Sequence, residues 1–159
     1  MRIEFQLPEL DQETVRLLPE FMNTLVEDMR YVVKYQSNIA LLDTRSKYLL
    51  KAEWISWVRK PRKLNMRKLI EYIADSIIFK QTDDGLFIVE INRAKRLPYS
   101  HTRLSKAARF LDKGNEVYKP TLFLSSVFNK YKRTINQYWR AFVSVKLGRI
   151  DVREVIRVR

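Results

Sequence analysis

The side chains that most often carry out catalysis are scarce in this chain of 159 residues. It contains no Cys, which excludes disulfides, thiolate metal ligands and Cys nucleophiles. Its single His, His101, stands in the loop-like stretch Leu-Pro-Tyr-Ser-His-Thr without the partners that a metal site or a proton relay requires. Its three Gly are too far apart to form a Gly-rich phosphate loop. We therefore expect a protein that is not an enzyme, with no catalytic residue, no metal and no cofactor.

Three carboxylates are the remaining candidates for metal chemistry. Asp83, Asp84 and Glu90 are close in sequence, and their oxygen atoms could hold a metal ion for a nuclease. Adjacent acidic residues before a Gly are, however, typical of a tight turn. We therefore interpret the acidic pair before Gly85 as turn residues.

Charge is distributed in alternating blocks along the chain, whose formal net charge is +13. Residues 1–40 hold 4 basic and 7 acidic groups, whereas residues 101–159 hold 14 and 4. Such a division favours contact with a polyanion, or docking onto acidic partners that include other copies of the chain. No run of 18 apolar residues and no signal-peptide pattern is present, so we expect a soluble protein.

The first helix is predicted over about Thr14–Ser37, because apolar residues recur there every three or four positions. Pro19 is unfavourable inside a helix, so the helix alternatively begins at Pro19, after a short turn. The segment Ile39–Val58 fits neither the helical nor the strand period, and its structure stays open. The helical stripe consists of Val15, Leu18, Met22, Leu25, Met29 and Val32.

A short helix and a β-hairpin are predicted in the middle of the chain. Asn65 is typical of an N-cap, and the helix runs from Met66 to about Ile73. Segments Ser76–Gln81 and Leu86–Asn92 are rich in β-branched and aromatic residues and flank the Asp-Gly turn, which predicts the hairpin.

Two helices and a tail are predicted in the C-terminal part. Thr102 caps a helix over Arg103–Asp112, and Gly114 ends it. The longest helix ends at Gly148 and has the stripe Leu124, Phe128, Tyr131, Ile135, Tyr138, Phe142 and Val145. Residues 149–159 alternate apolar and charged side chains, which predicts an edge strand or an arm ordered on a partner.

These elements predict the α+β class, with amphipathic helices packed on a small antiparallel sheet that includes a β-hairpin, and with a long C-terminal helix. Residues 1–148 are predicted to form a single domain, and residues 149–159 its C-terminal arm or edge strand.

The order of features over about Asn65–Phe142 resembles the tail-completion or head-tail joining (neck) proteins of tailed bacteriophages. The resemblance rests on Leu69–Ile77, the Asp84-Gly85 turn, Phe110–Asn115 and Lys119–Leu124. It implies a structural virion protein of the tail-completion or tail-terminator type, without enzymatic activity or cofactor, in a virion assembled in the host cytoplasm. It also implies a homo-oligomeric ring, a hexamer or dodecamer, around the DNA channel. Implied partners are neighbouring neck, tail-tube or portal-adaptor proteins and, weakly, the passing double-stranded DNA, but no membrane.

Ring assembly requires two unlike patches on each subunit. We expect the interface to use acidic residues of the first helix and basic residues of the last one: Glu20, Glu27, Asp28, Lys130, Lys132, Arg133 and Arg140. An exposed loop around Pro61 is expected to face DNA or a partner through Arg59, Lys60, Arg62 and Lys63.

The alternative function is sequence-independent nucleic-acid binding. The same loop lies close in sequence to Trp54 and Trp57, which would offer stacking surfaces beside phosphate contacts. No helix-turn-helix, zinc-finger or RNA-recognition signature accompanies these residues, so sequence-specific readout is not expected.

Overall fold

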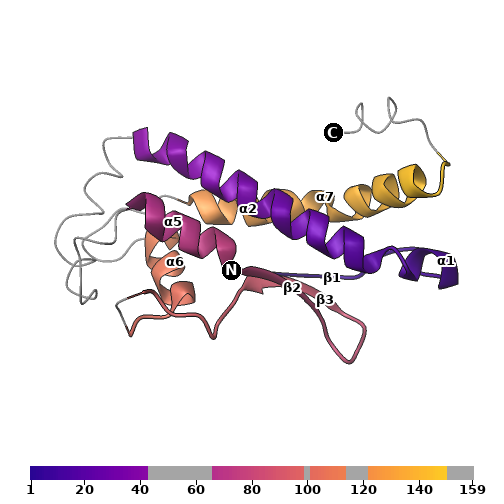
Figure 1. Ribbon diagram of the computed structural model, residues 1–159, viewed down its shortest axis with the longest axis horizontal. Helices are drawn as coiled ribbons and strands as arrows, with labels where there is room; N and C mark the ends of the chain where they lie inside the picture. Colours follow the sequence, from indigo (N-terminus) through magenta and orange to yellow (C-terminus); the bar gives the residue numbers. More distant parts are fainter. Residues whose placement is uncertain (43–65, 99–100, 114–121, 150–159) are drawn as a thin grey trace.

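The computed structural model describes residues 1–42, 66–98, 101–113 and 122–149 (Figure 1). Its elements form the predicted α+β fold. They are strands β1 (Arg2–Phe5), β2 (Ile77–Gln81) and β3 (Phe87–Ile91) and helices α1 (Gln12–Val15), α2 (Leu18–Leu42), α5 (Met66–Asp75), α6 (Leu104–Lys113) and α7 (Phe123–Lys146). The predicted caps Asn65 and Gly114, most of the open segment Ile39–Val58 and the tail after Arg149 lie outside the described residues.

The three strands form one antiparallel sheet in the order β1-β3-β2. The predicted hairpin is confirmed: β2 and β3 pair from Ile77 with Ile91 to Gln81 with Phe87. Gly85 has a φ of 78°, a left-handed conformation that glycine adopts without steric cost. β1 was not predicted, although Ile3 and Phe5 alternate with charged residues as in a half-buried strand.

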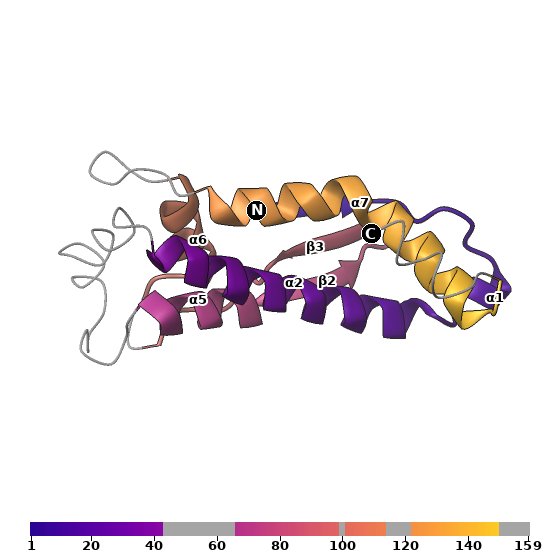
Figure 2. The same ribbon diagram turned by 90° about the horizontal axis from the view of Figure 1, so that it is seen from above.

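Both long helices lie on one face of this sheet, side by side (Figure 2). α2 lies over β2 and α7 over β1, and the shorter α5 and α6 fill the end of the molecule between them. In the described part of the chain, no helix covers the other face of the sheet (Figure 1). The apolar core therefore lies between one face of the sheet and a single layer of helices.

Aromatic rings from five elements meet in this core. Phe5, Phe79 and Phe87, one from each strand, have ring centroids 5.6 to 5.8 Å apart. Phe21 of α2 packs between them and α7, with its centroid 6.5 Å from Phe79 and 5.0 Å from Trp139. The Trp139 Nε1–H donates to the carbonyl oxygen of Pro8 at 2.9 Å, which satisfies its one polar group. The cluster binds the sheet to both helices.

The predicted first helix is divided into α1 and α2. α1 is capped by Asp11, whose carboxylate accepts the backbone N–H groups of Glu13 and Thr14; the Thr14 bond lowers the pKa of Asp11. α2 begins at Leu18, so Pro19 lies in its first turn, close to the start that the proline predicts. The predicted stripe is wrong at Val15, which is 48% exposed. Buried positions of α2 include Phe21, Val26 and Val33, whereas Met22 and Val32 are half-buried.

The predicted stripe of α7 is right in the first half and wrong in the second. Tyr131 and Ile135 are buried as expected, and the burial continues at Trp139 and Val143. Tyr138 and Phe142 are only partly buried, and Val145 is exposed. The prediction used a repeat of 3.5 residues, but a straight helix of 3.6 residues per turn drifts by about 20° per heptad. In the second half of α7 the buried residues instead recur every four positions, at Ile135, Trp139 and Val143, and Trp139 contacts Phe21.

A buried carboxylate connects α6 to α7. Asp112 is completely buried, and its side chain accepts hydrogen bonds from the backbone N–H of Ser125, at 2.9 Å, and from the Ser125 hydroxyl. Its own carbonyl oxygen accepts the N–H of Leu122, the residue before α7. Since Leu122 supplies no side-chain cap, Asp112 acts as the N-cap of α7 from another helix.

We expect Asp112→Ala to lower the free energy of unfolding by about 2 to 3 kcal/mol, because the first turn of α7 then loses its charged acceptor. Asp112→Asn retains one acceptor oxygen and should lose less. Chemical denaturation measures both. Lys113→Ala, at the exposed neighbouring position, is the control, and a loss of under about 0.5 kcal/mol for Asp112→Ala would refute the cap.

Candidate functional site

Two of the three acidic residues expected at an interface are used within the chain. The Glu20 carboxylate lies 2.5 Å from Lys146 Nζ, at the C-terminal end of α7. The Asp28 carboxylate accepts the Tyr131 hydroxyl at 2.5 Å. Both contacts join α2 to α7, so they contribute to the packing of the two long helices.

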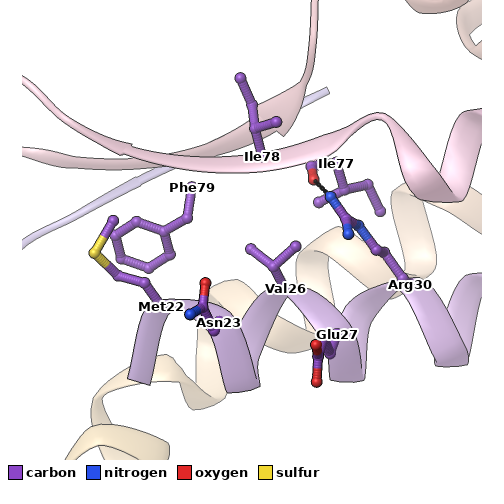
Figure 3. Close-up of a pocket in the computed structure, with 8 residues that line it drawn as sticks. All are labelled: Met22, Asn23, Val26, Glu27, Arg30, Ile77, Ile78 and Phe79. Carbon is purple, nitrogen blue, oxygen red and sulfur yellow. Dashed lines mark hydrogen bonds between the residues drawn. The ribbon is translucent and has the colours of Figure 1, made fainter. Parts of the chain in front are cut away.

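Glu27 differs from these two residues in its surroundings. It is exposed and lies at the rim of a hollow of about 210 Å³ between α2 and β2 (Figure 3). No described residue forms an ion pair with it. Glu27 is therefore the one member of the acidic set that is available to a partner.

The basic residues of α7 all face solvent. Lys130, Lys132, Arg133 and Arg140 are exposed, and none forms an ion pair with a described residue. Lys130, Arg133 and Arg140 lie opposite the buried stripe, because spacings of three and seven residues return to the same side of a helix. Lys132 lies apart from them, beside the end of β1. Since α7 contains no acidic residue, its outer surface carries uncompensated positive charge; we call Lys130, Arg133 and Arg140 the basic stripe.

The opposite side of the molecule carries an exposed acidic pair. Asp83 and Asp84 lie at the tip of the β2–β3 hairpin, which projects from the sheet away from α7 (Figure 1). Neither carboxylate has an ion-pair partner among the described residues. The basic stripe and the acidic hairpin tip are therefore two unlike charged surfaces on opposite sides of the subunit.

Glu90 belongs to the sheet and not to this turn. Its side chain is 4% exposed, it pairs with Lys80 of the neighbouring strand, and Arg93 Nε lies 3.7 Å from it. The Lys80 ammonium group donates to Oε1 of this buried carboxylate, whereas Oε2 accepts no hydrogen bond from a described residue. Among the described residues, no group of three or more His, Asp or Glu side chains could hold a metal ion.

Several predicted residues cannot be placed. Arg59, Lys60, Arg62 and Lys63 lie outside the described residues, as do Trp54 and Trp57. In the parts of the chain that are described, no helix is both long and apolar enough to cross a membrane.

Comparisons with known proteins found no relative of this chain. No protein-family model matches the chain, and neither a curated protein nor a solved structure matches it.

The contact between Asp28 and Tyr131 can be tested by a double-mutant cycle. We expect Asp28→Ala and Tyr131→Phe to show a coupling of about 1 to 2 kcal/mol in the free energy of unfolding, because the hydrogen bond is made to a charged acceptor. The control pairs Glu27→Ala with Tyr131→Phe, whose effects should add. Additive effects in the Asp28 cycle would mean that Asp28 is free to serve an interface.

Proposed function

We propose that the chain is a structural component of the neck of a tailed phage, of the tail-completion or tail-terminator type, that assembles as a ring around the DNA channel. The proposal needs no reaction chemistry from the chain. Its partners are other copies of the chain and adjacent neck, tail-tube or portal-adaptor proteins.

The observation that carries the proposal is the pair of unlike surfaces on opposite sides of the subunit. A closed ring uses a heterologous contact, in which one surface of a subunit meets a different surface of the next. The basic stripe of α7 and the acidic hairpin tip have opposite charge and face in opposite directions. Copies placed head to tail would bring Asp83 and Asp84 against the basic stripe.

In this arrangement the acidic surface of the interface is the hairpin tip and not the acidic residues of α2 that the sequence led us to expect. Glu20 and Asp28 are already bound to α7 of their own chain, so reversing their charge would disturb folding as well as contact. The hairpin tip has no such internal role. It is therefore the better position at which to test assembly.

Sequence-independent nucleic-acid binding is the second candidate, favoured by the absence of any acidic residue on α7. A helix with several exposed Lys and Arg side chains attracts phosphates and releases their counterions. The two functions predict different results for the same variants.

We expect Lys130→Glu, Arg133→Glu and Arg140→Glu together to weaken self-association. Exposed ion pairs contribute up to about 1 kcal/mol each, so the change corresponds to between about tenfold and about a hundredfold in Kd. The reciprocal variant with Asp83→Lys and Asp84→Lys should also self-associate weakly by itself. Mixing the two variants should restore assembly, because the hairpin tip of each variant then has the opposite charge to the α7 surface of the other. Native mass measurement at low and high salt gives the result.

A control with the same change in net charge replaces three exposed basic residues elsewhere, Arg16→Glu, Lys95→Glu and Arg109→Glu. It should assemble like the original chain. If the basic-stripe variant assembles normally and instead loses DNA affinity, with a salt slope reduced by about 3, the nucleic-acid function is correct and the ring proposal is wrong.

A further inference from the structure

Two tyrosines of α2 lie on the surface and are not part of the apolar core. Tyr31 is 67% exposed and Tyr35 is 58% exposed, which makes them the two most exposed large apolar side chains in the described part of the chain. Their rings stack on each other, with centroids 6.2 Å apart and planes inclined by 12°. Single exposed apolar residues are common, but a stacked pair of rings held in solvent is typical of a binding surface.

The pair lies on the side of α2 that faces α7. Asp28, Tyr31 and Tyr35 have the spacing i, i+3, i+7, which places them on one side of the helix. Asp28 accepts the hydroxyl of Tyr131, so this side is the one next to α7. The two helices are antiparallel, because Glu20, earlier in α2, meets the C-terminal end of α7. The residues that follow Asp28 therefore lie beside the N-terminal half of α7.

Positive charge accompanies the two rings. Lys130 precedes Tyr131 and therefore lies on the turn of α7 that meets Asp28, and Arg133 follows one turn later. Both side chains are exposed. No acidic residue follows Asp28 in α2, and none occurs in α7. The exposed rings and the basic stripe therefore occupy the outer surface of the same two neighbouring helices (Figure 2).

An aromatic stack beside lysine and arginine side chains matches the chemistry of a single-stranded nucleic acid. Every nucleotide combines an aromatic base with a negatively charged phosphate. Bases stack on exposed aromatic side chains with little regard to sequence, and basic side chains bind the phosphates. In a duplex the faces of the bases are covered by neighbouring base pairs, so only a single strand offers both groups at once.

We propose that Tyr31 and Tyr35 form a stacking platform for the bases of a single-stranded nucleic acid whose phosphates bind the basic stripe. The proposal goes beyond the neck function. It rests on the second candidate function, nucleic-acid binding, and names the form of nucleic acid that the chain prefers.

The test measures the affinity of the full chain for a fluorescently labelled oligothymidylate of about 12 nucleotides, a length within known single-strand site sizes. Tyr31→Ala together with Tyr35→Ala should weaken binding by between about fivefold and about a hundredfold, because a stacked base is lost. Tyr31→Phe together with Tyr35→Phe should bind within about twofold of the original chain, because stacking needs the ring and not the hydroxyl. A duplex of the same length should respond to either variant by less than about twofold.

The matched control is Tyr72→Ala, which removes a 38% exposed tyrosine from α5 and should bind the oligonucleotide like the original chain. Circular dichroism should show unchanged helix content in all variants, since alanine favours the helix and the positions are exposed. Equal losses for single strand and duplex, or an alanine variant that binds the single strand like the original chain, would overturn the proposal.

These substitutions leave every charge in place, so the alanine variant should self-associate like the original chain. Weaker self-association with unchanged oligonucleotide affinity would assign the two tyrosines to a contact between copies and refute the platform. If the original chain bound neither single strand nor duplex, the second candidate function would be wrong as well. Binding of both forms without any effect of the tyrosines would refute the platform alone.

Discussion

The packing of aromatic rings between the sheet and the two long helices is the contact on which the rest of the structure depends. Each strand contributes one phenylalanine, and Phe21 joins these rings to Trp139 of α7. Rings of this size dominate the apolar area that a small domain can bury. Because α7 turns Trp139 and its buried neighbours toward this cluster, its lysine and arginine side chains must face outward. The arrangement of the core therefore determines which surface of α7 is available to other molecules.

The charged residues of the two long helices fall into two groups, those with a partner inside the chain and those without one among the described residues. Glu20 pairs with Lys146, and Asp28 accepts a hydrogen bond from the Tyr131 hydroxyl, so both carboxylates have partners on α7 of their own chain. The basic stripe of α7 has no such partners among the described residues, and the acidic hairpin tip lies on the other side. Positive and negative charges that alternate in blocks along the sequence therefore lie on opposite sides of the folded chain. This separation can support head-to-tail contact and phosphate binding alike, because an exposed cation accepts either partner.

Local features of the fold were predictable from sequence, whereas features that depend on distant partners were not. The hairpin was found because its turn and both strands are adjacent, and α6 was placed within one residue at each end. The stripe of α7 was wrong near Trp139 because its partner Pro8 is 131 positions away. Asp112 was taken for an ordinary helix end, although an acid next to Leu111 on the apolar side of a helix indicates a buried polar contact. The acidic and basic sets were correctly assigned to helices, but the contacts of Glu20 with Lys146 and of Asp28 with Tyr131 could not be read from spacing.

The strand order has a consequence for the time course of folding. β2 and β3 are neighbours in sequence and can form a hairpin in about 1 to 10 μs. β1 pairs with β3 across 88 positions, from residue 2 to residue 90. At a synthesis rate of about 5 to 20 residues per second, β1 emerges roughly 4 to 18 s before its partner strand exists. Ile3 and Phe5 therefore remain without their partner strand until β3 has been synthesised.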